Sequence, residues 1–178
     1  KNYHRILSLD SAMAVVQFDK DGTEYQRKYF ISYPDSVMVM KFTANKKGKQ
    51  NLVLSYCPNS EAESYLSADG NNGLGYTGVL NNNKMKFAFR IKALHKGGIL
   101  KTENSRIIVK DADEVVFLLT ADTDYKINFN PDFNDPQTYV GKDPEQTTLA
   151  MMNNALEKGY DELIRNHKTD YTALFNRV

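Results

Sequence analysis

Apolar and polar residues alternate with a period of two over most of the first two thirds of the chain, the spacing of strands with one buried face. In the segment 84–94, Met85, Phe87 and Phe89 point to one side and mostly basic residues point to the other. Clusters of Asn, Asp and Gly, such as 69–73, separate the alternating segments and predict turns. About nine strands at intervals of about 8–12 residues predict a mainly β fold, an antiparallel β-sandwich.

The pattern changes near residue 122. The stretch DTDYKINFNPDFNDPQ is polar, shows no period and contains two prolines. Loops of this length without secondary structure are usually functional or disordered. We therefore expect the sandwich to occupy residues 1–126 and a loop to occupy residues 127–143.

Two helices are expected after this loop. Asp143 has the position of an N-cap, and Pro144 suits the first helical turn. The first helix should run to about Lys158, where Gly159 separates it from a second helix that continues to the end of the chain. These two helices would form a linker over residues 144–178.

The second predicted helix carries an apolar stripe at a spacing of three and four residues. Its members are Tyr160, Leu163, Ile164, His167, Tyr171, Leu174 and Phe175. Helices in proteins owe their stability mainly to the packing of an apolar face, so the stripe should be covered. We expect part of it to lie on the sandwich or on the first helix, around Ala150, Met151 and Leu156. The residues alone leave open what covers the rest.

Composition narrows the class of protein. A length of 178 residues suits one domain, 41% apolar residues suffice for a core, and 25% charged residues are typical of a globular protein. The net charge of +1 gives no electrostatic footprint for nucleic acid or an anionic membrane. No stretch approaches the roughly 18 apolar residues of a membrane span. We therefore expect neither a nucleic-acid nor a membrane partner.

Candidate chemistry is sparse. The single cysteine, Cys57, excludes an internal disulfide and is expected to be buried, and the three histidines are not at metal-ligand spacing. No phosphate loop or hydrolase motif occurs. The acidic cluster around Asp122 and Asp124 lacks the glycine and terminal glutamate of a calcium loop. We expect no catalytic residue, no metal and no cofactor in this chain.

Two alternatives remain open from the residues alone. A free-standing carbohydrate-binding module would need an exposed aromatic platform, which the absence of tryptophan disfavours. A complete small enzyme would need an acid/base pair of carboxyl groups within residues 122–135.

Four stretches together resemble a known family: residues 3–18, 27–42, 111–125 and 160–178. They contain a Tyr-x-Arg-x-Leu-x-Leu strand at Tyr3–Leu9, a Tyr-Phe-x-Ser-Tyr-Pro-Asp segment at Tyr29–Asp35, and a His-x-x-Asp-Tyr-x-x-Leu-Phe-x-Arg-Val helix at His167–Val178. In this order, the motifs resemble the N-terminal domain of glycoside hydrolase family 95. That family comprises bacterial α-L-fucosidases, some of which act on related α-L-galactosides. The resemblance covers nearly the whole chain.

The resemblance implies a β-supersandwich, a helical linker and then an (α/α)₆ barrel that holds the catalytic carboxylates. These residues would be the later part of the sandwich and the linker, and no catalytic residue of the family has a counterpart among them. The resemblance further implies an inverting enzyme that degrades fucosylated glycans in the periplasm or outside the cell. Phosphorylases of maltose and related sugars have a similar layout, so the substrate of the parent enzyme stays open.

The resemblance also suggests roles for particular residues. The polar loop would border the sugar cleft of the parent, with Tyr125, Asn128 and Asn130 as its contacting groups. The barrel of the same chain would cover the rest of the helical stripe, and His167 would be a packed, hydrogen-bonded interdomain residue. Without the barrel, the exposed linker helices could pair two copies of the chain.

Overall fold

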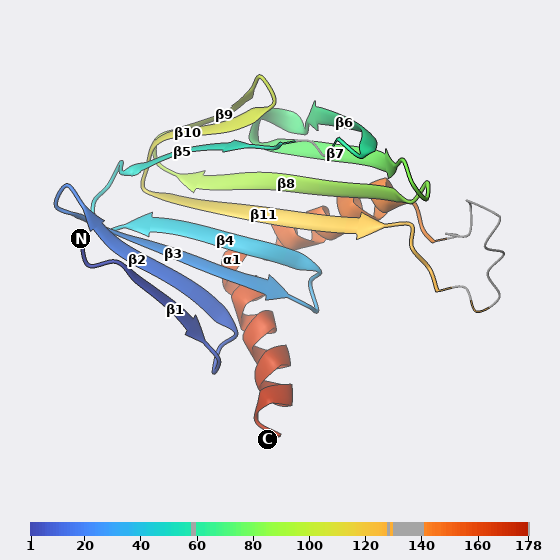
Figure 1. Cartoon of the computed structure of the whole chain (residues 1–178). Coiled ribbons are helices and arrows are strands. Elements are labelled where there is room, and N and C mark those ends of the chain that lie inside the picture. Colours follow the sequence, from blue (N-terminus) through green and yellow to red (C-terminus); the bar gives the residue numbers. More distant parts are fainter. Residues whose placement is uncertain (58–59, 128, 130–140, 178) are drawn as a thin grey trace.

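The computed structural model describes residues 1–57, 60–127, 129 and 141–177. In these residues, eleven strands form two sheets and a long helix, α1, follows them (Figure 1). Every strand pair is antiparallel. The mainly antiparallel β fold predicted from the alternating pattern is thus confirmed.

The larger sheet has eight described strands in the order β1-β2-β3-β4-β11-β8-β7-β6. Their bounds are β1 His4–Ser8, β2 Met13–Lys20, β3 Thr23–Ser32, β4 Val37–Ala44, β6 Ala62–Ala68, β7 Gly73–Leu80, β8 Lys86–Lys96 and β11 Glu114–Thr123. A short 3₁₀ helix, η1 (Gly70–Asn72), precedes β7. The last strand among the described residues, β11, lies between β4 and β8. The middle of the sheet is therefore formed by strands that are distant in sequence.

The smaller sheet has the order β5-β10-β9, with bounds β5 Gln50–Ser55, β9 Ile99–Glu103 and β10 Arg106–Ala112. It packs on one face of the larger sheet, which we call the inner face. Ile107 and Val109 of β10 are fully buried there, and the cluster includes Val115 and Phe117 of β11. This cluster is the core of the sandwich, as expected for two sheets packed face to face.

The helix α1 (Pro144–Phe175) covers the other face of the larger sheet, which we call the outer face. Asp143 caps its start, because a carboxylate oxygen accepts a hydrogen bond of 3.0 Å from the backbone N–H of Glu145. Met152 and Ala155 are the buried residues of its first part, together with Pro144 and Thr148. Of the contacts expected around residues 150, 151 and 156, Leu156 does pack on this core, whereas position 150 is exposed.

Two smaller features of the described residues bear on the sequence analysis. Cys57 is exposed, so the expectation that it is buried was wrong. Its neighbour Tyr56, by contrast, packs on Tyr76, with ring centroids 4.3 Å apart. No helix in the described part of the chain combines the length and apolar character needed to cross a membrane.

Candidate interdomain surface

A glycine divides α1 into two segments. Gly159 has φ 70° and ψ 173°, a conformation outside the helical region and close to one that only glycine adopts readily. The two predicted helices are therefore present, but they join directly at a kink with no loop between them. Figure 1 shows the first segment behind the larger sheet and the second one descending past its edge to the C-terminus.

A buried carboxylate fixes the two segments to the sheet and to each other. Asp35, in the turn between β3 and β4, is 3% exposed. Its oxygens accept hydrogen bonds from Ser32 Oγ at 2.6 Å, Lys158 Nζ at 2.7 Å and Asn166 Nδ2 at 3.2 Å. Lys158 precedes the kink at Gly159 and Asn166 follows it, so a single carboxylate sets the angle between the segments.

The hydrogen bonds around Asp35 favour its ionised carboxylate form. Burial by itself would raise the pKa of Asp35, but the hydrogen bonds from Lys158, Ser32 and Asn166 outweigh it and hold the pKa below its ordinary value. The same hydrogen bond raises the pKa of the Lys158 ammonium. The pair is therefore a charged ion pair at neutral pH.

His167 forms the second attachment of the kinked helix. It is 5% exposed, its ring stacks on Phe30 with centroids 4.9 Å apart, and its Nε2 lies 3.1 Å from the carbonyl oxygens of both Ser11 and Ala12. Carbonyl oxygens only accept hydrogen bonds, so Nε2 carries a proton and donates it. His167 is thus packed and hydrogen-bonded, but the partners found here belong to its own domain.

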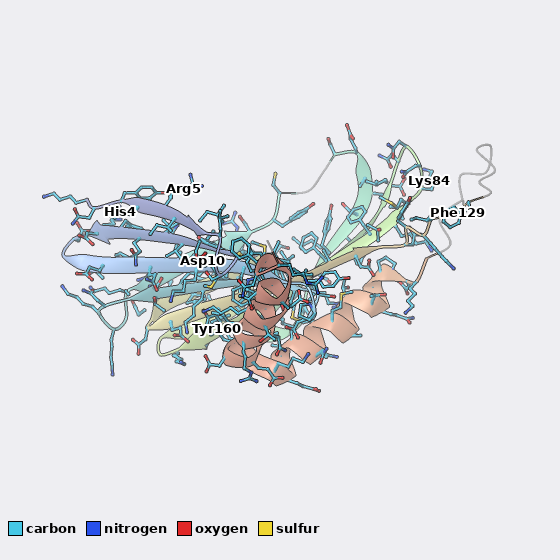
Figure 2. All side chains as sticks on the ribbon, turned by 90° about the horizontal axis from the view of Figure 1, so that it is seen from below. His4, Arg5, Asp10, Lys84, Phe129 and Tyr160 are labelled. Atoms are coloured by element: carbon cyan, nitrogen blue, oxygen red, sulfur yellow. The ribbon has the colours of Figure 1, made fainter. Side chains whose placement is uncertain are left out.

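The base of the second segment also lies on the sheet. Leu163 is fully buried, and Tyr160 and Ile164 pack against the same cluster. The ring of Tyr160 lies edge-on to Phe30, with centroids 6.1 Å apart, and the ammonium of Lys41 sits 4.1 Å from its centroid. Burial, followed by the charges of Glu114 and Asp161, raises the pKa of the Tyr160 hydroxyl. Figure 2, a view from below, labels Tyr160 on α1, which lies in front of the sheet.

Beyond His167, the stripe leaves the sandwich. The rings of His167 and Tyr171 are 6.4 Å apart and those of Tyr171 and Phe175 are 5.3 Å apart, so the stack that begins on Phe30 continues along the helix. Exposure increases along it, to 56% at Leu174 and 39% at Phe175. The stripe is therefore covered at its base and open at its tip.

Further apolar side chains lie beside this open end. A hollow of about 420 Å³ between the strand ends and the helix is lined by Tyr33, His167 and Tyr171, among others. Tyr33 is 83% exposed and Leu7, which also lines the hollow, is 69% exposed. We call the combined area the terminal apolar surface. It consists of Leu7, Tyr33, Tyr171, Leu174 and Phe175.

Of the three residues predicted to border a sugar cleft, Tyr125 is in the described part of the chain. Tyr125 follows β11 and is 58% exposed. Asn128 and Asn130 lie outside the described residues. Phe129, between them, sits at the opposite end of the sheet from His4 and Arg5 (Figure 2).

The acidic residues near this loop have structural partners. Asp124 accepts a hydrogen bond of 2.9 Å from the backbone N–H of Lys86, and its own carbonyl accepts one of 2.8 Å from Gly141. Within the described ranges, no three His, Cys, Asp or Glu side chains are grouped so that they could hold a metal ion.

Sequence reasoning missed the role of Asp35 and its partners. Asp35 entered the sequence analysis only as the last residue of the Tyr29–Asp35 motif. No local signal marked the contact, because Lys158 and Asn166 stand beside other charged residues, such as Glu157 and Arg165. Only the folded chain shows that both side chains point to one carboxylate.

Comparison with known proteins identifies the class of this fold. The family model described as glycosyl hydrolase family 65, N-terminal domain, matches residues 1–128, and the chain belongs to that family. Among solved structures, a "Putative kojibiose phosphorylase from human microbiome" superposes with a TM-score of 0.60 over 96% of this chain and 24% of that one. At 11% sequence identity, this likeness shows the fold alone.

Two curated relatives are more specific. "Probable alpha-fucosidase A" of Aspergillus niger is 29% identical over 185 residues, which cover 98% of this chain and 22% of that protein. "Alpha-L-fucosidase 2" of Arabidopsis thaliana is 24% identical over 208 residues, covering 99% of this chain and 23% of that protein. The chain thus spans less than a quarter of either relative. The resemblance to a fucosidase N-terminal domain is confirmed, although the matched family model carries the number 65, not 95.

Proposed function

We propose that this chain is the non-catalytic N-terminal domain of a fucosidase-like glycoside hydrolase, and that its terminal apolar surface seats the catalytic domain of the same polypeptide. The observation that carries this proposal is the ring stack that starts on buried Phe30 and ends on exposed Phe175. The lengths of the relatives support it, because each leaves more than three quarters of its chain unmatched.

The energetics favour a covered surface. Burying a Leu or Phe side chain stabilises a protein by about 1.5–3 kcal/mol. Leu174 and Phe175 forgo much of this in the isolated chain, and Tyr33 and Leu7 are exposed on the same surface. Contiguous exposed apolar patches usually mark interfaces. Because the helix carrying this surface is fixed by Asp35 and His167, the domain would present the surface in one orientation.

Under this proposal, the catalytic carboxyl groups belong to the catalytic domain of the parent and not to this chain. Glycoside hydrolysis requires two carboxyl groups flanking the scissile bond, and the sequence shows no such constellation. We expect the isolated chain to release no fucose from aryl α-L-fucosides or fucosylated oligosaccharides, whereas the longer parent does. Turnover by the isolated chain at an enzymatic rate, abolished by substituting one of its own residues, would refute a purely supporting role.

Side-chain footprinting tests the seating surface directly. Tyr33 and Tyr65 provide a matched pair, because they are 83% and 78% exposed. Tyr33 belongs to the terminal apolar surface, whereas Tyr65 lies on β6 at the far edge of the larger sheet. In the longer parent, hydroxyl-radical oxidation of Tyr33 and Phe175 should fall several-fold relative to the isolated chain, and that of Tyr65 should not. Equal labelling of Tyr33 in both forms would exclude this surface.

We also propose that the loop after β11 borders the sugar cleft, through Tyr125, Asn128 and Asn130. The exposure of Tyr125 is compatible with a contact to another domain or a ligand. Replacing Asn128 and Asn130 by Ala in the longer enzyme should lower kcat/KM for a fucoside. An unchanged kcat/KM would show that the loop does not contribute to the active site.

The proposal extends to location and assembly. By its resemblance, the parent would act on fucosylated glycans in the periplasm or outside the cell, which fractionation of the producing cells would test.

In the isolated chain, the terminal apolar surface could pair two copies. Light scattering distinguishes a monomer from such a dimer, and a dimer that persists when residues 160–178 are removed would not involve the second helical segment.

A further inference from the structure

One aromatic side chain of the larger sheet belongs to neither core of the domain. Leu66 of β6 packs against the core on the inner face. Its neighbour Tyr65 therefore points to the outer face, because successive side chains of a strand alternate. The core beneath α1 includes none of the described residues of β6, and Tyr65 is 78% exposed. Packing within the described part of the chain does not explain an aromatic residue at this position.

Tyr65 lines a hollow, which we call the Tyr65 hollow, between three strands and the start of α1. The hollow measures about 250 Å³, and its lining residues come from β6, β7, β8 and the first residues of the helix. They include Glu63, Tyr65, Thr77, Lys86, Asp143 and Glu145. Sites for drug-sized ligands measure about 300–1,000 Å³, so this hollow has the size for one ring of a ligand.

The start of α1 is fixed against β8 beside the Tyr65 hollow. Glu145 lies 3.6 Å from the guanidinium of Arg90 in an ion pair, and Asp143 caps the helix through the backbone N–H of Glu145. On the strand side, the backbone N–H of Lys86 donates to Asp124 at 2.9 Å. Figure 1 shows that α1 begins at the end of the larger sheet where the chain leaves β11. The walls are therefore in place before a ligand binds, which lowers the entropic cost of binding.

The charged groups of the hollow favour a neutral ligand with many hydroxyl groups. Three carboxylates line it, those of Glu63, Asp143 and Glu145, against the single ammonium of Lys86. An anionic ligand would therefore be repelled. The carboxylates of the described residues are not grouped so that they could hold a metal ion. Carboxylate oxygens do accept hydrogen bonds from hydroxyl groups, and an ammonium donates to them.

The Tyr65 ring provides an apolar platform for such a ligand. The face of an aromatic ring carries partial negative charge, and a pyranose ring presents weakly positive C–H groups on its faces and hydroxyl groups at its rim. A sugar ring that lies on Tyr65 would direct its rim toward the carboxylates. Glu63 is the acceptor best placed for this, since it lies two residues before Tyr65 on the same face of β6. Asp143 and Glu145 already have partners in the protein.

We propose that the Tyr65 hollow binds one sugar ring of a neutral glycan, with Tyr65 as the stacking platform and Glu63 as an acceptor for the hydroxyl groups. The class of ligand rests on the proposed function, because a domain of a glycoside hydrolase meets glycans. The hollow adjoins the loop after β11 through the hydrogen bond between Lys86 and Asp124. A glycan held there would lie beside the proposed sugar cleft, at a site separate from the terminal apolar surface.

Nuclear magnetic resonance titration of the 178-residue chain tests binding without the catalytic domain. The probes are methyl α-L-fucoside, lactose and fucosyllactose. The backbone amide signals of Tyr65, Thr77 and Glu145 should shift in a saturable manner with fucosyllactose, with a dissociation constant on the order of 1 mM. A response to the fucoside identifies the bound ring as fucose, and a response to lactose identifies it as the sugar that carries fucose. If none of the three probes shifts these signals saturably, the proposal is wrong.

Two exposed tyrosines provide a matched pair of variants. Tyr65 and Tyr33 are 78% and 83% exposed, but of the two only Tyr65 lines the hollow. Tyr65→Ala should weaken binding of fucosyllactose by about tenfold or more. Tyr65→Phe should retain binding because the ring remains, and Tyr33→Ala should leave it unchanged. Circular dichroism verifies that each variant is folded. Equal losses in the two alanine variants, or no loss in Tyr65→Ala, would refute the role of the ring.

The role of the carboxylates is tested separately. Glu63→Gln should weaken binding several-fold, because a neutral amide is a weaker acceptor than a carboxylate. Sialyllactose carries a carboxylate of its own in place of fucose, so it should bind the wild type several-fold more weakly than fucosyllactose, and Glu63→Gln should narrow this difference. A wild type that prefers sialyllactose would contradict the role assigned to Glu63.

Another part of the parent is the competing occupant of the hollow. In the footprinting experiment, oxidation of Tyr65 should be the same in the isolated chain and in the longer parent. A several-fold fall in the parent would show that protein covers the hollow, and the sugar site would be excluded. That result would leave the loss of labelling at Tyr33, and with it the proposed seating surface, intact. Conversely, equal labelling of Tyr33 in both forms would not affect sugar binding at Tyr65 in the isolated chain.

Discussion

Two stretches of α1 carry the same kind of apolar stripe, but only one of them is buried. From Met152 to His167, the residues at three- and four-residue spacing are covered by the outer face of the sheet. From Tyr171 to Phe175, the same spacing continues and the side chains become exposed. The spacing of apolar residues therefore predicts that this face of the helix is buried against something. Only the folded structure shows which part of the face the sheet covers.

The comparison also separates two roles within one helix. The buried stretch holds the domain together, so changes there should unfold the isolated chain. The exposed stretch contributes little to the isolated chain and should matter only when another domain is present. Each experiment below tests this division, beginning with the largest expected effect.

Truncating Leu163 should have the largest effect. Its side chain is fully buried between α1 and the sheet. Leu163→Ala should lower the free energy of unfolding by about 2–5 kcal/mol, the usual cost of a core cavity. Urea unfolding followed by circular dichroism measures this. Leu174→Ala provides the matched control at a 56% exposed site and should change the value by less than about 0.5 kcal/mol. Similar losses for both variants would remove the distinction between the two stretches.

Features that depend on neighbouring residues could be predicted from the sequence, whereas contacts between residues far apart in the chain could not. The strands, the Asp143 cap, the break at Gly159 and the helical stripe depend on neighbouring residues and were found. The register of the first helix was partly wrong, because 149–152 are four consecutive apolar residues and do not define one face. Met152 faces the core, and Leu149 is 42% exposed.

Contacts between distant residues could not be predicted in this way. Asp35 lies 123 residues from Lys158 and 131 from Asn166, and no local pattern joins them. The insertion of β11 between β4 and β8 is equally remote in sequence.

Neutralising Asp35 should have the second largest effect. Asp35→Asn removes charged hydrogen bonds from a buried site and should destabilise the chain by about 1.5–3 kcal/mol at neutral pH. Asp10→Asn is the control, because Asp10 is exposed. Thermal or urea unfolding at pH 7 measures both. A loss no greater than that of the control would show that the ion pair does not hold the kink.

The pH dependence of this effect has a defined sign. The folded-state pKa of Asp35 lies below the ordinary value of 3.8. Its contribution to stability is therefore complete above that value and is lost as the pH falls through the lower, folded-state pKa. The stability difference between the wild type and Asp35→Asn should be constant from neutral pH down to about 5 and shrink in more acidic solution. A difference that grows on acidification would contradict the lowered pKa.

Substituting the kink residue should have a smaller effect. Gly159→Ala forces an alanine to adopt φ 70°, or else straightens the helix and breaks its attachments. No atom lies within 4 Å of the added Cβ, so the expected loss of about 1–3 kcal/mol comes from the backbone alone. Gly75→Ala is the control, since its Cβ would be at an ordinary 3.5 Å from the nearest atom. If both variants melt at the wild-type temperature, the kink is not constrained by its glycine.

The smallest effect in the isolated chain should come from the exposed tip of the helix. Leu174→Ser and Phe175→Ser together remove the end of the ring stack, but these side chains are 56% and 39% exposed. We expect a change of less than about 1 kcal/mol in the isolated chain. In the longer parent, the same pair should cost several times more and lower the yield of active enzyme, because the side chains would then be buried against the catalytic domain. Unfolding of both forms and fucoside turnover of the parent measure the contrast. An equally small effect in the two forms would mean that the exposed stripe faces solvent in the parent as well, and the catalytic domain would have to be seated elsewhere.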